Sequence, residues 1–303
     1  MTDGATQPPV GRLYAVEGLK LSLNRTGEGS PAVVVMPGAG LIGLDYLNLQ
    51  DALDGAATVV TYDRAATGWS DPVALPRSAA AVAQESRALL QAAGIAPPYL
   101  LVGHSLGGAY ARRYAQLFPD EIAGLLFLDP AHEGYEIDPP RMGLVDQVRQ
   151  TIRLLGAFLR FKAVYRPMFA RMYAAWPAPL RRTLVDYHLR AWRKTLQETR
   201  NLQSEVMGEV RDGGALPDRP LIVLTALGLD PFMARFAPEP YLRALNDRKR
   251  QFYANFAATV PRGENRLVED AGHSTLHIDR PDAVIQAIRD LIGGFANSSR
   301  PEV

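Results

Sequence analysis

The sequence predicts an α/β fold, in which a mostly parallel sheet carries helices on both faces. Two observations indicate this fold. Most of the strand-like runs are continuously apolar instead of alternating, which is typical of strands buried on both faces. Helical stretches separate several of these runs along the chain. A length of 303 residues, 47% of them hydrophobic, is sufficient for a large core.

The predicted elements follow a polar, proline-bearing segment at residues 1–11, which we expect to be a flexible tail. The β-rich runs cover residues 19–24, 32–36, 57–62, 99–102, 122–128, 221–225 and 266–269. The helical patterns among them cover residues 78–93, 106–117, 241–259 and 281–295. Helices placed between consecutive strands are the connections that a parallel sheet requires.

One long segment interrupts this alternation. Between Asp129 and Pro217 no strand-like run occurs, and helical patterns cover residues 143–160, 180–198 and 202–210. Prolines are expected to break the helices at Pro167, Pro177 and Pro179. We therefore expect a core formed by residues 12–133 and 217–303, interrupted by a helical insertion at residues 134–216.

The insertion is rich in aromatic and methionine side chains, and these side chains have two interpretations. They either pack the insertion against the core or line an apolar substrate pocket beneath it. The residues concerned are Phe158, Phe161, Tyr165, Met168, Phe169, Met172, Tyr173 and Trp176.

Charge and composition exclude several classes of function. The 33 Lys and Arg nearly balance the 32 Asp and Glu, so no overall positive field favours nucleic acid or an anionic membrane surface. The absence of cysteine excludes thiolate metal sites and a cysteine nucleophile. Residues 1–10 lack the basic and apolar regions of a signal peptide, and no apolar run is long enough to span a membrane. We expect a cytoplasmic protein without a nucleic-acid partner.

The strongest functional motif is the pentapeptide Gly103-His104-Ser105-Leu106-Gly107. It lies directly between an apolar strand and a helix, which is the context of a nucleophile elbow. The flanking glycines are needed because side chains there collide with the neighbouring strand and helix. The turn exposes Ser105 at the carboxyl edge of the sheet, with the Leu106 N–H free to bind an oxyanion at the helix N-terminus. These positions predict Ser105 as the nucleophile.

A serine nucleophile needs a base, and His273 is the candidate among five histidines. It follows the last apolar strand and precedes the final helix, so its loop reaches the same sheet edge as Ser105. His273 and His277 are four residues apart, but Ser274 occupies the position where a zinc protease motif has glutamate. We therefore expect no metal site there.

These motifs resemble those of the α/β-hydrolase superfamily, over residues 12–297. The matching segments are Gly-His-Ser-Leu-Gly-Gly at 103–108, Tyr62-Asp63-Arg64, Gly68-Trp69-Ser70-Asp71 and Ala271-Gly272-His273. The resemblance implies eight strands, a helical cap inserted after strand six, and a catalytic triad in the order serine, acid, histidine. It also implies the Ala39 N–H as second oxyanion donor.

Two positions depart from the family pattern. Pro37 and the residues after it replace the His-Gly motif that is usual after strand three, and Ala66 stands where many relatives have glycine. Both departures concern the loops around the oxyanion site and leave the serine elbow intact.

The acid has two candidates under the resemblance. Asp129 ends strand six, where some members of the superfamily carry the acid, and Asp230 follows strand seven, the more widespread position. The long separation of Asp230 from His273 favours Asp129, with Asp230 as the alternative and Glu133 as a remoter third candidate. The aspartate that is not the acid is then a structural residue at a strand end or turn.

The expected chemistry is a two-step acyl transfer. Ser105 attacks a carbonyl carbon, His273 moves the proton, and the Leu106 and Ala39 N–H groups bind the oxyanion. No cofactor or metal is needed, and the apolar insertion predicts a hydrophobic small-molecule ester, lactone or thioester. An acyltransferase, a lyase or a carbon–carbon bond hydrolase with the same triad remains an alternative, as does a non-catalytic ligand receptor. The oligomeric state is left open.

Overall fold

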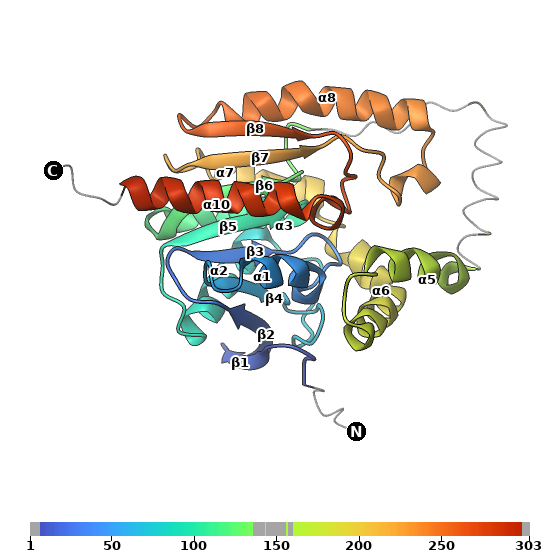
Figure 1. Ribbon diagram of the computed structural model, residues 1–303, viewed down its shortest axis with the longest axis horizontal. Helices are drawn as coiled ribbons and strands as arrows, with labels where there is room; N and C mark the ends of the chain where they lie inside the picture. Colours follow the sequence, from blue (N-terminus) through green and yellow to red (C-terminus); the bar gives the residue numbers. More distant parts are fainter. Residues whose placement is uncertain (1–6, 136–142, 144–155, 157–159, 299–303) are drawn as a thin grey trace.

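The computed structural model describes residues 7–135, 143, 156 and 160–298, which form one α/β unit (Figure 1). Eight strands form a single sheet in the order β1-β2-β4-β3-β5-β6-β7-β8. Strand β2 is antiparallel to both of its neighbours, and all other neighbours are parallel. The strands are β1 (Arg12–Val16), β2 (Leu19–Thr26), β3 (Ala32–Met36), β4 (Val59–Tyr62), β5 (Tyr99–His104), β6 (Ile122–Leu128), β7 (Leu221–Ala226) and β8 (Gly263–Val268).

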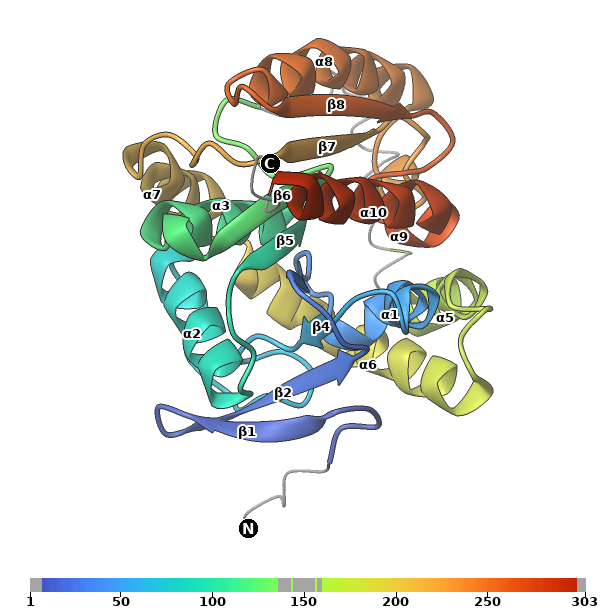
Figure 2. The ribbon, with the colours of Figure 1, turned by 60° about the vertical axis from the view of Figure 1, so that its left-hand side comes forward.

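Both faces of the sheet are covered by helices, which explains why the strands are continuously apolar. On one face, Val33 and Val35 pack in a cluster with residues of α1 (Leu47–Leu53) and α10 (Pro281–Ser298). On the other face, Val34 and Met36 pack with α2 (Ala79–Ala92), α3 (Leu106–Leu117) and α8 (Glu239–Ala257). Figure 2 shows α10 and α1 together on one side of the strands. The predicted mostly parallel sheet with helices on both faces is confirmed.

Two elements near the N-terminal side of the sheet were not predicted. The edge strand β1 is paired with β2, but only one of its five residues is buried, so it lacks the apolar run by which the other strands are recognised. Helix α1 has only seven residues and follows a short 3-10 helix at Gly43–Tyr46. Such short helices give too few turns for a clear period in the sequence.

The segment between β6 and β7 is mostly helical in the part that is described. Helix α5 (Phe161–Met172) and helix α6 (Ala178–Glu198) lie beyond the carboxyl ends of the parallel strands (Figure 1), and α7 (Met207–Asp212) follows a π-helical turn at Leu202–Val206. The helix predicted over residues 143–160 lies largely outside the described residues.

Pro167, which was expected to break a helix, instead lies inside α5. A proline removes one backbone hydrogen bond from a helix. The aromatic side chains of Tyr165 and Phe169 on either side of it are buried in an apolar cluster with α6, and this packing holds α5 together. The expectation of a break at Pro167 was therefore wrong.

None of the helices in the described part of the chain is long and apolar enough to cross a lipid bilayer.

Candidate active site

Ser105 lies in a tight turn between β5 and α3, in strained backbone geometry. Its φ is 52° and its ψ is −119°, a region that residues other than glycine rarely adopt. The turn is held by hydrogen bonds from the Ser105 N–H to Leu128 O at 3.1 Å and from the Ala131 N–H to Ser105 O at 2.9 Å. A Cβ at Gly103 or Gly107 would come within 2.7 Å and 2.1 Å of neighbouring backbone atoms. The sequence pattern thus reflects a real steric requirement of this turn.

His273 lies on the loop between β8 and the short helix α9 (Leu276–Asp279), and its ring points at Ser105. Its Nε2 is 2.9 Å from Ser105 Oγ, and its Nδ1 is 2.6 Å from Asp129 Oδ2. A carboxylate only accepts, so Nδ1 carries the proton and Nε2 is left to accept from the serine hydroxyl. The structure therefore brings three of the predicted residues together in a hydrogen-bonded series.

Asp129, directly after β6, is buried and makes contacts with three donors. Besides His273, Lys249 on α8 approaches the same Oδ2 at 2.6 Å, and the Ala226 N–H donates to Oδ1 at 3.2 Å. Burial alone would raise the pKa of Asp129, but the charges and hydrogen bonds of Lys249 and His273 outweigh it and hold this pKa well below its usual range. Asp129 is therefore a carboxylate at neutral pH.

Asp230 makes a different set of contacts. Its Oδ1 accepts from the N–H groups of Phe232 and Met233 at 2.9 and 2.8 Å, and its Oδ2 accepts from the Ser274 N–H at 2.6 Å. It thus closes the turn after β7 and fastens it to the loop of His273. Glu133, the third candidate, is bound by Arg112, whose Nη2 lies 2.9 Å from its Oε1.

The loop of His273 is also held from within the elbow by His104. Its Nε2 donates to the His273 carbonyl at 2.8 Å, and its Nδ1 accepts from the Tyr46 hydroxyl at 2.8 Å. Tyr46 in turn accepts from the Gly38 N–H at 3.2 Å. Burial, with a smaller contribution from His273, lowers the pKa of His104 to about 4, so the ring is neutral and its two roles are compatible.

The loop that carries Ala39 is fixed by a buried ion pair. Arg64 donates to the carbonyls of Pro37 and Gly38, and it also pairs with Glu198 at 2.7 Å. Glu198, the last residue of α6, accepts from the Gly40 N–H at 2.8 Å with its other oxygen. Both charged side chains are buried. Glu198, a residue of the insertion, therefore holds the loop that carries Ala39. In the superfamily that the sequence resembles, a His-Gly motif is usual in this loop.

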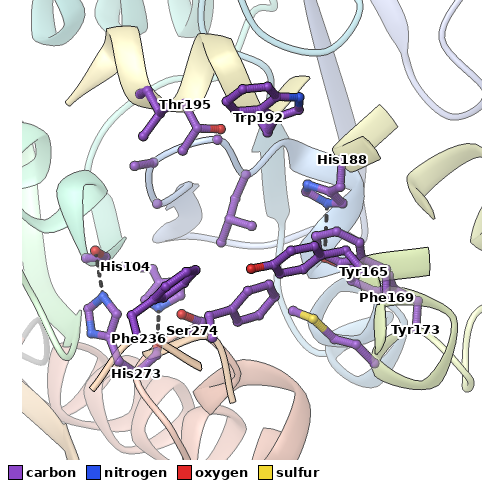
Figure 3. Close-up of a pocket in the computed structure, with 18 of the residues that line it drawn as sticks. His104, Tyr165, Phe169, Tyr173, His188, Trp192, Thr195, Phe236, His273 and Ser274 are labelled. Atoms are coloured by element: carbon purple, nitrogen blue, oxygen red, sulfur yellow. Dashed lines mark hydrogen bonds between the residues drawn. The ribbon is translucent and has the colours of Figure 1, made fainter. Parts of the chain in front are cut away.

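Ser105 and His273 open onto a cavity of about 830 Å³ (Figure 3). Most of its wall is aromatic or aliphatic and comes from α5, α6 and the segment after β7. No Asp, Glu, Lys or Arg lines it among the described residues. The wall includes Ala39, Leu41, Phe161, Tyr165, Phe169, Met172, Tyr173, His188, Trp192, Leu196, Phe232 and Phe236. A cavity of this size and character suits an apolar small molecule.

The aromatic and methionine residues singled out in the insertion divide between the two expected roles. Phe161, Tyr165, Phe169, Met172 and Tyr173 line the cavity and also belong to the packed cluster beside it. Met168 and Trp176 belong to the cluster without lining the cavity, and Phe158 lies outside the described residues.

Sequence reasoning missed three residues that position the site: Lys249, Arg64 as an ion-pair partner, and Glu198. Lys249 is 120 residues from Asp129, and Glu198 is 134 residues from Arg64. No local motif marks such pairs. The only available signal was at Lys249, whose neighbours one helical turn away, Leu245 and Tyr253, are apolar, and this signal is weak.

Known proteins resemble parts of this sequence. A probable transporter of Hormonema carpetanum, efuK, is 34% identical over 126 residues, which cover 40% of this chain and 18% of that protein. The human (lyso)-N-acylphosphatidylethanolamine lipase is 34% identical over 107 residues, which cover 34% of this chain and 31% of that lipase. The first three curated relatives are each matched over less than half of their length.

The fold of a solved esterase from Exiguobacterium antarcticum superposes with a TM-score of 0.63 at 14% identity, covering 94% of this chain and 100% of the esterase. At 14% identity, this similarity is evidence for the fold alone. The model of the alpha/beta hydrolase family matches residues 33–287, from β3 to the last helix. Because this match covers well over half of the chain, the protein belongs to the alpha/beta hydrolase family.

Proposed function

We propose that this protein is a serine hydrolase that cleaves a carboxylic ester, lactone or thioester of a hydrophobic small molecule. The observation that carries the proposal is the series Ser105 Oγ, His273 Nε2 and Nδ1, Asp129 Oδ2, which opens onto an apolar cavity. The names of two similar proteins, a lipase and an esterase, agree with this reaction class.

In the first step, the Ser105 oxygen attacks the carbonyl carbon while its proton passes to His273 Nε2. Asp129 accepts from Nδ1 and stabilises the imidazolium that forms. The N–H groups of Leu106 and Ala39 bind the oxyanion. Leu106 is the first residue of α3, and Ala39 lies in the cavity wall. The proton on His273 then goes to the leaving alcohol, and an ester of Ser105 remains.

In the second step, water attacks this acyl ester while His273 Nε2 takes a proton from the water. The Ser105–acyl bond breaks, and His273 returns the proton to Ser105. The acid leaves through the cavity. We also propose the domain division 12–133 and 217–303 for the core and 134–216 for a cap that supplies about half of the residues of the cavity wall.

The test is hydrolysis of a graded series of chromogenic acyl esters, from short to long chains, by the wild type and by Ser105→Ala. We expect turnover with an optimum at medium or long chains, and its loss in Ser105→Ala by about 10⁴-fold or more. No turnover of any ester by the folded wild type would contradict the proposal and favour a lyase, a carbon–carbon hydrolase or a receptor.

The same assay separates the two acid candidates. Asp129→Asn is expected to lower kcat by about 10⁴-fold, since an amide cannot fix the tautomer of His273 in the same way. Asp230→Asn keeps the volume of a side chain that only fastens loops, so kcat is expected to stay within about tenfold of wild type. The reverse order of the two losses would assign the acid to Asp230.

A further inference from the structure

One polar cluster at the cavity takes no part in the hydrolysis steps. It consists of His188 on α6, Tyr173 after α5, and Asp45 in the 3-10 helix before α1. His188 and Tyr173 line the cavity, whereas Asp45 contacts both of them and has no exposed surface. Figure 3 shows His188 across the cavity from His273, with a dashed line to Tyr173. A substrate whose scissile carbonyl lies at Ser105 therefore meets this cluster with its far end.

One proton on the His188 ring accounts for its contacts within the cluster. Nε2 is 2.9 Å from Asp45 Oδ1 and 3.0 Å from the Tyr173 hydroxyl, and this hydroxyl donates to the same carboxylate oxygen. The other oxygen of Asp45 accepts from the Ile42 N–H at 2.7 Å. Burial would raise the pKa of Asp45, but its contact with His188 and the hydrogen bonds that it accepts outweigh burial and lower this pKa, so Asp45 is a carboxylate. Because a carboxylate only accepts, Nε2 carries the ring proton and Nδ1 presents a lone pair.

Nδ1 of His188 is an unused acceptor in a mostly aromatic part of the wall. It has no hydrogen-bond partner among the described residues, yet it is not sealed in the interior. The side chain is only 8% exposed, and the ring borders the cavity. Phe169 stacks on the ring with 5.0 Å between the centroids, and the Tyr187 ring meets it edge-on at 5.2 Å. These contacts hold the imidazole in place and leave Nδ1 as its polar atom for a ligand.

An acceptor in this position discriminates among the groups that a substrate can place against it. A wholly apolar substrate would cut Nδ1 off from water without a partner, which costs binding free energy. A ketone or ether oxygen would turn its own lone pairs toward that of Nδ1. A hydroxyl group donates to the lone pair and satisfies it. A charged end group fits poorly, because no Asp, Glu, Lys or Arg lines the described cavity wall.

We propose, as a deepening of the serine hydrolase function and resting on it, that His188 selects a substrate with a hydroxyl group at the end remote from the scissile carbonyl. The hydroxyl donates to Nδ1, and the rest of the part that fills the cavity is apolar. Asp45 is a positioning residue in this recognition, since it fixes the tautomer in which Nδ1 accepts.

The experiment compares three 4-nitrophenyl esters of equal chain length, with a methylene, a hydroxyl or a ketone near the far end of the acyl chain. For the wild type we expect kcat/KM to be about tenfold higher for the hydroxy ester than for the plain ester, from one hydrogen bond to a nitrogen that the plain ester leaves unpaired. The keto ester should be no better than the plain ester. A keto ester cleaved as well as the hydroxy ester, or better, would overturn the assignment of a donor. Equal cleavage of the hydroxy and plain esters would overturn the proposal and leave the hydrolase function intact, whereas cleavage of none of the three would contradict the hydrolase function itself.

Two variants locate the preference in the wall. His188→Phe keeps a ring but removes the acceptor, so the hydroxy and plain esters should be cleaved with kcat/KM values within about twofold of each other. Tyr165→Phe is the matched control, because it removes a hydroxyl from the cavity wall outside the Asp45 cluster, and it should retain the tenfold preference. The ratio between two esters is compared within each variant, so a general change in activity cancels. Loss of the preference in Tyr165→Phe, or its retention in His188→Phe, would overturn the proposal.

Asp45→Asn tests the tautomer of the ring, and it also serves where His188→Phe folds poorly. The Ile42 N–H retains the oxygen of the new amide on its own side, so the amide NH₂ group faces Nε2 and donates to it. The ring proton then moves to Nδ1, which becomes a donor. In this variant we expect the keto ester to be cleaved about as well as the hydroxy ester. The wild-type order of the three esters in folded Asp45→Asn would overturn the proposal.

Discussion

At the scale of single residues, the environment of Asp129 depends on Lys249. The two side chains form a buried ion pair, and Lys249 also contacts the Ala226 carbonyl at 3.3 Å. Asp129 has a φ of 43°, so its backbone is strained as well. The lysine thus supplies the positive charge that lets a carboxylate remain buried in this position, and it shares one oxygen with His273.

Replacing Lys249 by methionine is expected to destabilise the protein by about 3–5 kcal/mol, because it leaves a buried carboxylate without its cation. Chemical denaturation at pH 7 measures this loss. The double variant Lys249→Met with Asp129→Asn should lose less than the sum of the two single losses, since no unpaired charge remains. Lys162→Met, at an exposed position of α5, is the control and should change stability by less than about 0.5 kcal/mol. Equal denaturation midpoints for Lys249→Met and wild type would contradict this account.

At the scale of elements, helix α6 connects the insertion to the loop that carries Ala39. Glu198 at its C-terminal end binds Arg64 and the Gly40 N–H, and Thr195 packs so closely on Gly40 that a Cβ there would meet its hydroxyl at 2.1 Å. The helix therefore has two roles in the structure, since it lines the cavity and also fixes the loop beside Ser105.

Glu198→Gln tests the second function of α6. The amide group of glutamine would place a donor against either Arg64 or the Gly40 N–H, so the loop is expected to shift and the Ala39 N–H to lose its alignment. We expect kcat to fall by about tenfold or more while KM stays within about twofold, because the apolar wall is unchanged. Gln197→Ala, at an exposed neighbouring position, should leave both constants unchanged. A lower melting temperature with unaltered kcat would show that Glu198 has only a structural role.

The elements also show what the sequence can and cannot predict. Helix α3 and strand β6 have the predicted bounds, because a long apolar run or a full helical period marks them locally. The exposed edge strand β1 and the short helix α1 carry no such mark. Within the site, Ser105 and His273 were found from local motifs, whereas the contact of Lys249 with Asp129 exists only after folding.

At the scale of the whole molecule, buried ionisable groups couple stability to pH. Burial, with a smaller effect of neighbouring charges, lowers the pKa of His104 and of His132 to about 4 and that of His277 to about 3. Unfolding restores their ordinary values near 6.5, so the unfolded chain binds more protons at these sites between about pH 4 and 6.5. Asp63 acts in the opposite direction, because burial raises its pKa to about 6 and the folded state retains its proton.

Three histidines outweigh one aspartate, so the free energy of unfolding is expected to fall as the pH is lowered through this window. We expect a loss of about 4 kcal/mol between pH 7 and pH 5, measured by urea denaturation at each pH. His277→Phe retains a ring against Tyr46, on which His277 stacks at 4.4 Å, and removes one titrating group. Any change in packing shifts the variant's stability equally at both pH values. The loss of stability between pH 7 and pH 5, in contrast, should shrink by roughly 2 kcal/mol. An unchanged loss in His277→Phe would mean that His277 does not stay neutral in the folded protein, and that its burial does not contribute to the sensitivity to acid.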